Sequence, residues 1–230
     1  MKRSIATLAA ATIGLGTLGL AATPALAAPR VGTAAKQEID RKIDERLARL
    51  SLLHSKVDGG KRMTDSDRTT LDGILETDTS GLTALRIQVD AATDAKTLAG
   101  YAKSMVEDYR VYMVVTPQVH LTIGSDAVGA ITTQLVSTLE PKLDDAIAKA
   151  KAAGKDTTAA EAANATVKAD VAAAAADVEG LSPTLVALTP HGYPANEPTM
   201  VDARAKLADA RTQLNGARAA AHQVVDALKA

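Results

Sequence analysis

MVDARAKLADARTQLNGARAAAHQVVDAL, residues 200–228, carries the most regular pattern in this chain of 230 residues. Apolar side chains recur at every seventh residue along it, at Met200, Leu207, Leu214, Ala221 and Leu228. Smaller side chains fill a second line between them, at Ala203, Ala210, Ala217 and Val224. A repeat sustained over four heptads predicts a long helix that packs along its length against other helices, as in a coiled coil.

Apolar residues spaced by three and four also run through the first half of the chain. They predict a helix from residue 36 that ends at Asp58–Gly60, because glycine tolerates the backbone conformations found after a helix. Thr64, with Asp67 three residues later, predicts the cap of a second helix. The phase of the apolar residues then restarts, which predicts a break at 90–94 before a third helix.

The second half of the chain shows two further apolar series. The first, over 128–150, contains Pro141, which should kink the helix because proline lacks an N–H and its ring crowds the preceding turn. Gly154 should end that helix. The second series begins with a capping box, TAAE at 158–161, and continues past Pro183, where the helix can bend.

The composition suits long helices in close contact better than one large core. Hydrophobic residues make up 47% of the chain, but many are alanine, and aromatic residues make up only 2%. We therefore predict an all-α fold, an elongated antiparallel helical bundle or coiled coil, with one short non-helical segment rich in Tyr and Val near 110–124. Loops are expected near 58–63, 116–124, 154–157 and 189–198.

The N-terminus predicts export. MKR is a positively charged start, residues 5–20 are apolar, and Ala25-Leu26-Ala27 matches a signal-peptidase site that would be cut between Ala27 and Ala28. An uncleaved membrane anchor is the alternative. The expected organisation is a signal peptide at 1–27, a flexible N-terminus at 28–35 and a helical bundle domain at 36–230.

The sequence contains no recognisable catalytic or metal-binding motif. There is no HExxH, GxSxG or GxxxxGK[ST], and no two of the histidines, His54, His120, His191 and His222, lie four residues apart. The absence of Cys excludes disulfides and thiolate chemistry, and a net charge of -1 argues against nucleic-acid binding. The helix faces, rich in Ala and in charges of both signs, argue against stable membrane insertion after signal cleavage. We predict a protein that is not an enzyme and uses no cofactor or metal.

YRVYMVVTPQVHLTI, residues 109–123, departs from the helical rhythm around it. One interpretation continues the third helix to Val115 and stops it before Pro117, after which apolar and polar residues alternate as in a strand. The other makes all of 111–123 extended. Both interpretations predict that this segment is not a regular helix throughout, because a proline, β-branched residues and Gly124 fall together.

The same segment is the candidate binding region. It is either a packed connector, or a recognition surface whose polar contacts would come from Tyr109, Arg110, Tyr112, Gln118 and His120. The loop His191–Pro194 carries the remaining Tyr near a His and is a less specific second site.

The signal peptide, the helices rich in Ala, Thr and Asp, and the central YRVYMVVTPQVHL segment resemble small secreted helical proteins of unknown function from actinobacteria. The resemblance implies an exported protein, secreted or associated with the envelope, and it supplies no catalytic residues.

Two functional hypotheses follow. The first is a non-enzymatic exported protein with a structural or protein-interaction role at the cell envelope, which binds another envelope protein or self-associates through its helix seams. The alternative is a small-ligand binding module with a pocket at 101–123, where Tyr101, Tyr109, Tyr112 and His120 would converge.

Overall fold

The computed structural model describes residues 32–229, and over this range every regular element is helical and no β-strand occurs. The predicted all-α bundle is confirmed. The signal peptide and its cleavage between Ala27 and Ala28 lie outside the described residues. The first helix already begins at Thr33, inside the 28–35 segment that we expected to be flexible.

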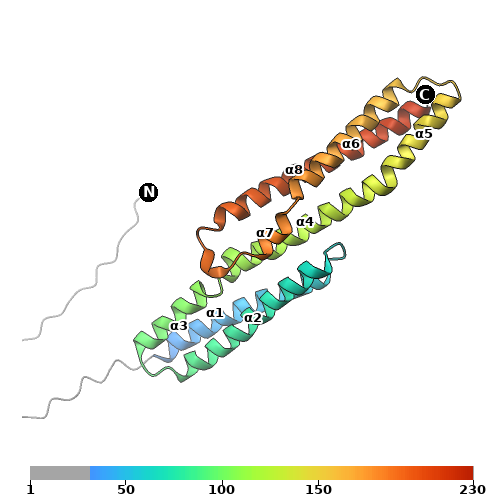
Figure 1. The fold of residues 1–230 in the computed structure, drawn as a ribbon. Helices are drawn as coiled ribbons and strands as arrows, with labels where there is room; N and C mark the ends of the chain where they lie inside the picture. Colours follow the sequence, from blue (N-terminus) through green and yellow to red (C-terminus); the bar gives the residue numbers. More distant parts are fainter. Residues whose placement is uncertain (1–31, 230) are drawn as a thin grey trace, which may run out of the picture.

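The first three helices form one end of an elongated molecule (Figure 1). Helices α1 (Thr33–Asp58) and α2 (Asp65–Ala91) make an antiparallel hairpin, and α3 (Ala95–Glu107) packs beside it. The hairpin loop follows Asp58 and the break lies between Ala91 and Ala95, so both predicted interruptions are confirmed. Buried Leu, Ile and Val side chains from all three helices share one apolar cluster.

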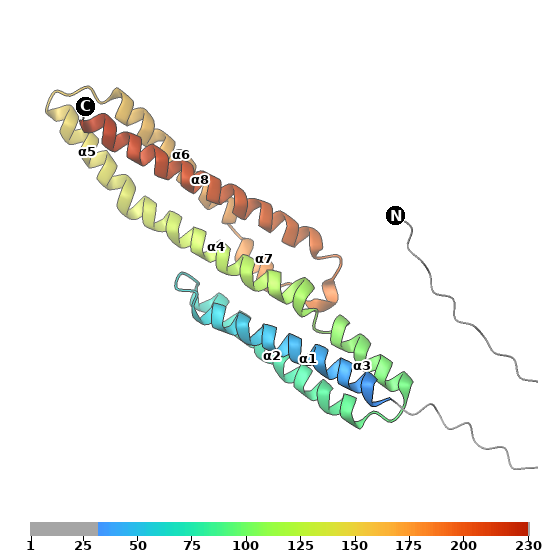
Figure 2. The same cartoon turned by 180° about the vertical axis from the view of Figure 1, so that it is seen from behind.

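The remaining helices form the other end. A continuous helical stretch contains η1 (Val111–Val115), α4 (Thr116–Gln134), η2 (Leu135–Leu139) and α5 (Glu140–Ala152). The chain returns through α6 (Thr158–Val178), turns through α7 (Leu181–Val186) and η3 (Pro190–Gly192), and runs out again as α8 (Glu197–Lys229). Helix α6 is therefore antiparallel to both α5 and α8, whereas α4–α5 and α8 run in the same direction (Figures 1 and 2).

Two apolar clusters follow one another along this second end. The nearer one joins α4, α6, α7 and α8, and the farther one joins α5, α6 and α8. The contact between α6 and α8 uses small side chains, with Ala163, Ala174, Ala203, Ala210 and Ala217 all buried. Small residues let the axes of two helices approach closely, so this seam is the tight part of the bundle.

Helix α4 connects the two ends of the molecule. Val119 near its start belongs to the cluster of α1–α3, and Leu121 and Val128 belong to the next cluster. Asp126 adds a polar connection, because its carboxylate accepts hydrogen bonds from Ser182 Oγ at 2.6 Å and from the Thr64 backbone N–H at 3.0 Å. Burial raises the pKa of Asp126, and these two hydrogen bonds oppose that increase.

The predicted non-helical segment near 110–124 is wrong, and so is the predicted loop at 116–124. Val111–Val115 form one turn of π-helix, and Thr116 begins α4 with Pro117 as its second residue. Pro141 follows the second π-turn, Leu135–Leu139, in the same way. Each proline thus comes directly after a widened turn, which removes the usual bonding pattern that a proline ring would disturb.

The sequence also misplaced two later boundaries. The helix expected from 158 past Pro183 ends at Val178, because Gly180 adopts a left-handed conformation with φ +68°, and Pro183 lies in the separate short helix α7. The capping box at 158–161 does not form with Thr158 as its cap; the Thr158 N–H instead donates to Asp156 Oδ1 at 2.9 Å. By contrast, Thr64 caps α2 as predicted, accepting from the Asp67 N–H at 3.1 Å.

The segment 189–198, expected to be free of regular structure, is only partly a loop. Pro190–Gly192 form a short 3-10 helix, and α8 begins at Glu197 with Pro198 in its first turn. The first turn of a helix accepts proline because its N–H groups have no partner within the helix.

Asp78 lies inside the apolar seam of α2, where we expected it at the seam's edge. Asp78 is only 7% exposed, and its Oδ2 has no hydrogen-bond partner within residues 32–229. Burial raises the pKa of this carboxyl group to about 7, because the charged form loses its hydration.

Gly81 and Gly73 on α2 should respond in opposite directions to replacement by alanine. A Cβ at Gly81 would lie 2.5 Å from the Tyr109 hydroxyl oxygen and 2.6 Å from its ring, so the ring must move and G81A should destabilise the protein by about 1–3 kcal/mol. A Cβ at Gly73 meets nothing within 4 Å, so G73A should stabilise it by about 0.5–1 kcal/mol. Urea unfolding measures both; equal shifts would contradict the close contact of Tyr109 with α2.

Candidate functional site

The candidate site begins where α3 turns into η1. Arg110 is the one non-glycine residue between 32 and 229 with a positive φ, at 38°, and its carbonyl accepts from the N–H of Val114 at 2.9 Å and of Met113 at 3.1 Å. Such a left-handed conformation costs energy for a side chain with a Cβ. The turn separates α3 from the continuous helical stretch that begins with η1, and the residues after it, Tyr112 and Met113, lie on the outside of the molecule.

Tyr112 and Met113 are the residues that this turn exposes. They are 47% and 49% exposed, although their neighbours Val111, Val114 and Val115 are buried. The Arg46 guanidinium of α1 lies over the Tyr112 ring, 5.4 Å from its centre, within the range of a cation–π contact. The Tyr112 ring is therefore held in place while one side of it stays open to a partner.

The second Tyr-bearing segment, the loop His191–Pro194, comes to the same place. Arg110 lies over the Tyr193 ring at 4.9 Å, and His191 Nε2 lies 3.5 Å from the Asp108 carboxylate. Asn196 Nδ2 donates to the Thr189 carbonyl at 3.0 Å and closes the loop on itself. The two sites that the sequence suggested separately are thus parts of one site.

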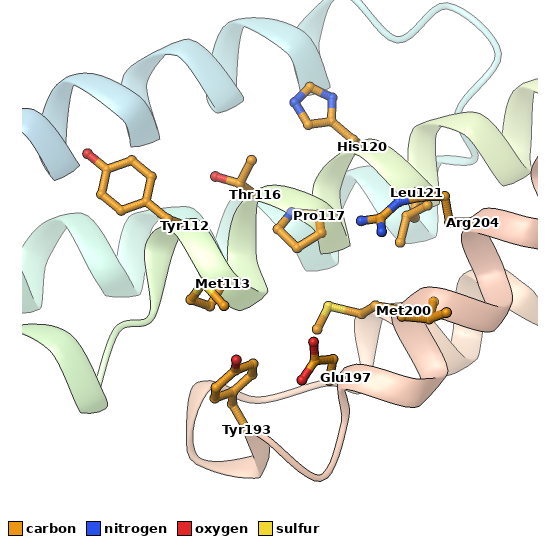
Figure 3. Close-up of a pocket in the computed structure, with 11 residues that line it drawn as sticks. Tyr112, Met113, Thr116, Pro117, His120, Leu121, Tyr193, Glu197, Met200 and Arg204 are labelled. Carbon is orange, nitrogen blue, oxygen red and sulfur yellow. The ribbon is translucent and has the colours of Figure 1, made fainter. Parts of the chain in front are cut away.

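A cavity of about 410 Å³ lies between this loop, the start of α8 and the start of α4 (Figure 3). Tyr112, Met113, Pro117 and His120 contribute from one side, and Tyr193, Glu197, Met200 and Arg204 from the other. Val201, 54% exposed, also lines it. We refer to six of the exposed and half-exposed side chains around the cavity as the Tyr112 surface; these are Tyr112, Met113, His120, Tyr193, Val201 and Arg204.

His120 lies between this cavity and α1. Its Nε2 is 3.4 Å from Arg49 Nη2, and Arg49 Nε donates to Thr116 Oγ1 at 3.2 Å. Partial burial, together with the nearby charges of Lys56 and Arg49, lowers the pKa of His120 below its usual value. His120 is therefore neutral near pH 7, and its ring can accept a hydrogen bond as well as donate one.

Gln118 has a structural role and lies away from the Tyr112 surface. Its side chain is buried, and Nε2 donates to the carbonyls of Leu185 at 2.9 Å and Leu188 at 3.0 Å. These carbonyls belong to the end of α7 and the residues after it, which have too few N–H partners of their own. Gln118 thus fastens α7 to α4, so its proposed role as a binding contact is not supported by its position.

The pocket that would bring Tyr101, Tyr109, Tyr112 and His120 together does not form. Tyr101 and Tyr109 pack against the apolar cluster of α1–α3, and only Tyr112 and His120 line the cavity. Burial, together with the charges of Asp108 and Asp78, raises the pKa of Tyr109. Tyr109 therefore acts as a packing residue, and Arg110 contributes by holding Tyr193.

The charge around the Tyr112 surface is mainly positive. Arg46, Arg49 and Arg204 border it, and none of them forms an ion pair with another residue in the described part of the chain. Glu197 is the one acidic side chain that lines the cavity among residues 32–229. An apolar surface with a cationic border favours a partner that carries apolar side chains next to acidic ones.

Four residues of the site were missed by reasoning from the sequence. Met113 was passed over beside its Tyr neighbours, and Met200 was assigned only to the heptad pattern. Val201 and Arg204 follow Met200 on α8, and no short-range signal shows that the loop before α8 brings them beside Tyr112. The one indication in the sequence was an apolar residue, Val201, one position off the heptad line.

Two further properties of residues 32–229 bear on function. No group of three or more His, Asp or Glu side chains is placed to hold a metal ion within this range. None of its helices combines the length and apolar character needed to cross a bilayer.

Comparison of the chain with protein-family models, with curated proteins and with solved structures yields no match.

Proposed function

We propose that this protein is an exported, non-enzymatic helical protein that binds a partner protein of the cell envelope through the Tyr112 surface. The exposure of Tyr112, Met113 and Val201 around one cavity is the observation that carries the proposal. Large apolar side chains left open next to one another commonly mark interaction sites.

The composition of the surface supports a protein partner. Tyrosine offers a large, rigid contact area with a polar tip, and methionine adapts its shape to a partner. Arg46 and Arg110 hold the two Tyr rings by cation–π contacts, so less conformational entropy is lost when a partner binds. The partner is expected to place an apolar side chain in the cavity and acidic side chains against Arg49 and Arg204.

The proposal of export rests on the sequence of the first 27 residues. MKR, the apolar run at 5–20 and the small residues Ala25 and Ala27 are typical of a cleaved signal peptide.

A photo-crosslinking side chain placed at Met113 tests the proposed surface in the producing cells. We expect one dominant cross-linked protein from Met113, and none from the same side chain at Ile87, which is also exposed but lies on α2 away from the site. The protein purified from these cells should begin at Ala28, the first residue after the predicted cleavage site. Tyr112→Ala and His120→Ala should each reduce the cross-link at least fivefold while the melting temperature stays within about 2 °C, because both side chains face outward.

The opposite pattern would identify Tyr112 as a packing residue. In that case Tyr112→Ala would lower the melting temperature strongly, and the cross-link would fall only in proportion to the folded fraction. Equal cross-linking from Met113 and Ile87 would show that no specific surface exists.

A further inference from the structure

Helix α8 leaves part of its heptad pattern uncovered near the C-terminus. The line of Ala203, Ala210, Ala217 and Val224 is buried against α6 along its whole length. The line of seventh residues is buried at Met200 and Leu207 but only partly buried at Leu214 and Ala221. A strict heptad pattern would be covered on both lines, so an apolar partner is missing beside the second half of α8.

An open slot of about 430 Å³ lies at this place, between α8 and the stretch from α4 to α5. One wall carries Ile131, Leu135, Leu139 and Leu143. The other wall carries Leu214, Ala217, Ala221 and Val225. Small residues on α8 let it pack closely on α6, and the bulkier wall of α4–α5 does not close the remaining gap.

The second π-turn forms part of this slot. Leu135 and Leu139 are the first and last residues of η2, and no residue of η2 is buried. Single π-turns inside α-helices occur often at functional sites, because the extra residue per turn moves side chains out of the regular helical positions. Here the turn leaves two leucine side chains facing an open apolar space.

The slot is elongated. The residues that line it span Leu214 to Val225, about 16 Å along α8 at 1.5 Å per residue. Its volume of about 430 Å³ lies within the ~300–1,000 Å³ typical of small-molecule sites, and eight of the ten residues that line it are apolar. An extended hydrocarbon chain, whose carbon atoms contact neighbours at about 4 Å, can lie along such a slot.

The basic side chains at the slot indicate which polar group a bound ligand would carry. Arg218 and His222 are the only titratable side chains that line it in the described part of the chain. They lie four residues apart on one face of α8, both are exposed, and neither forms an ion pair or a side-chain hydrogen bond within residues 32–229. A carboxylate that bound there would gain a charge-assisted hydrogen bond from Arg218.

We propose that this slot is a binding site for a single long-chain fatty acid, whose acyl chain lies along Leu135, Leu139 and Leu214 and whose carboxylate contacts Arg218. A second copy of the protein is the other candidate occupant, because a twofold interface places the same surface on both sides. A stable dimer that does not bind palmitate would overturn the proposal. The proposal is independent of the Tyr112 surface, which lies at the opposite end of α8.

Titration calorimetry of the full mature chain with palmitate, kept below the concentration at which it self-associates, tests the proposal. We expect one palmitate per chain. Arg218→Gln should weaken binding about tenfold or more, because the charge-assisted contact is lost, whereas Lys206→Gln on the same helix, outside both sites, should leave it unchanged. Ala221→Phe should abolish binding by filling the slot, and its control Ala219→Phe, at an exposed position, should not.

Further binding measurements distinguish binding at this site from general adsorption of lipids to the protein. A primary amine with the same hydrocarbon chain should bind at least tenfold more weakly than palmitate, and butyrate should give no heat of binding. Equal affinity for the amine, equal binding by Arg218→Gln and Lys206→Gln, or sedimentation of the protein with phosphatidylglycerol vesicles would each overturn the proposal. Because Arg218 is exposed, Arg218→Gln should fold normally, and its binding measurement tests the proposal even if Ala221→Phe fails to fold.

Discussion

Asp78→Asn is expected to raise the stability of this protein by about 2–4 kcal/mol at pH 8 and to change it little at pH 4. The pKa of Asp78 is about 7 in the folded state and near 3.8 when exposed, so the folded state binds a proton more tightly than the unfolded state. The contribution of protonated Asp78 to the free energy of unfolding is fully present below pH 3.8. This contribution is lost as the pH rises through 7, and the loss amounts to at most about 4 kcal/mol.

The neutral amide of Asn removes this pH dependence because it cannot ionise. Chemical unfolding of both proteins at several pH values from 4 to 8 measures the difference directly. Asp209→Asn, at an exposed position on α8, is the matched control and should show little difference at any pH. A gain for Asp78→Asn that is the same at pH 4 and pH 8 would show that its ionisation is not linked to folding.

Leu207→Ala should cost about 2–5 kcal/mol of the free energy of unfolding. Leu207 is almost completely buried in the cluster shared by α4, α6, α7 and α8, and a Cβ built on Gly124 of α4 would lie only 3.2 Å from its Cδ1. Truncation therefore removes apolar burial and leaves a cavity between α4 and α8. Since a domain is stable by only ~5–15 kcal/mol, the melting temperature should fall markedly.

Leu52→Ala is the control for Leu207→Ala. Leu52 is exposed on α1, so the same chemical change should alter stability by less than about 0.5 kcal/mol. Differential scanning calorimetry of the two variants gives the comparison. Similar losses at the two positions would contradict the placement of Leu207 between α4 and α8.

Elements with one buried face could be predicted from the sequence. Helix α8 was recognised from its heptads, and the end of α1, the cap at Thr64 and the break before α3 followed from local residues. In each case the helix or its end was predicted from an apolar seam or from a cap or turn residue, and such features involve only residues close together in the sequence.

The first half of helix α4 could not be predicted, because it packs on both ends of the molecule. Its buried residues, Gln118, Val119, Leu121, Thr122 and Ser125, spread over nearly half of the helix circumference, and three of them are polar. A face so broad and partly polar gives a weak apolar period of 3.6, and the alternation of Val119, Leu121 and Ile123 then resembles a strand. Pro117 strengthened that error, although the π-turn before it removes the conflict with a helix.

The candidate site was only partly predictable for a related reason. Tyr112 and His120 were identified because Tyr is rare in this chain and the segment is unusual. Gln118 was indistinguishable from them in sequence, yet it points inward to the carbonyls of α7. Val201 and Arg204 reach the site only through the turn at 190–196, and a contact between segments so far apart leaves no local pattern.

The hydrogen bonds of Gln118 have a consequence for how α6 and α8 are aligned. Their seam is built from small residues repeated every three or four positions, so sliding one helix along the other by seven residues would replace many alanines and valines by similar ones. Such a repetitive interface specifies its register weakly. By fastening α7, the link between the two helices, to α4, Gln118 restrains such a slip and favours the observed alignment of the hairpin.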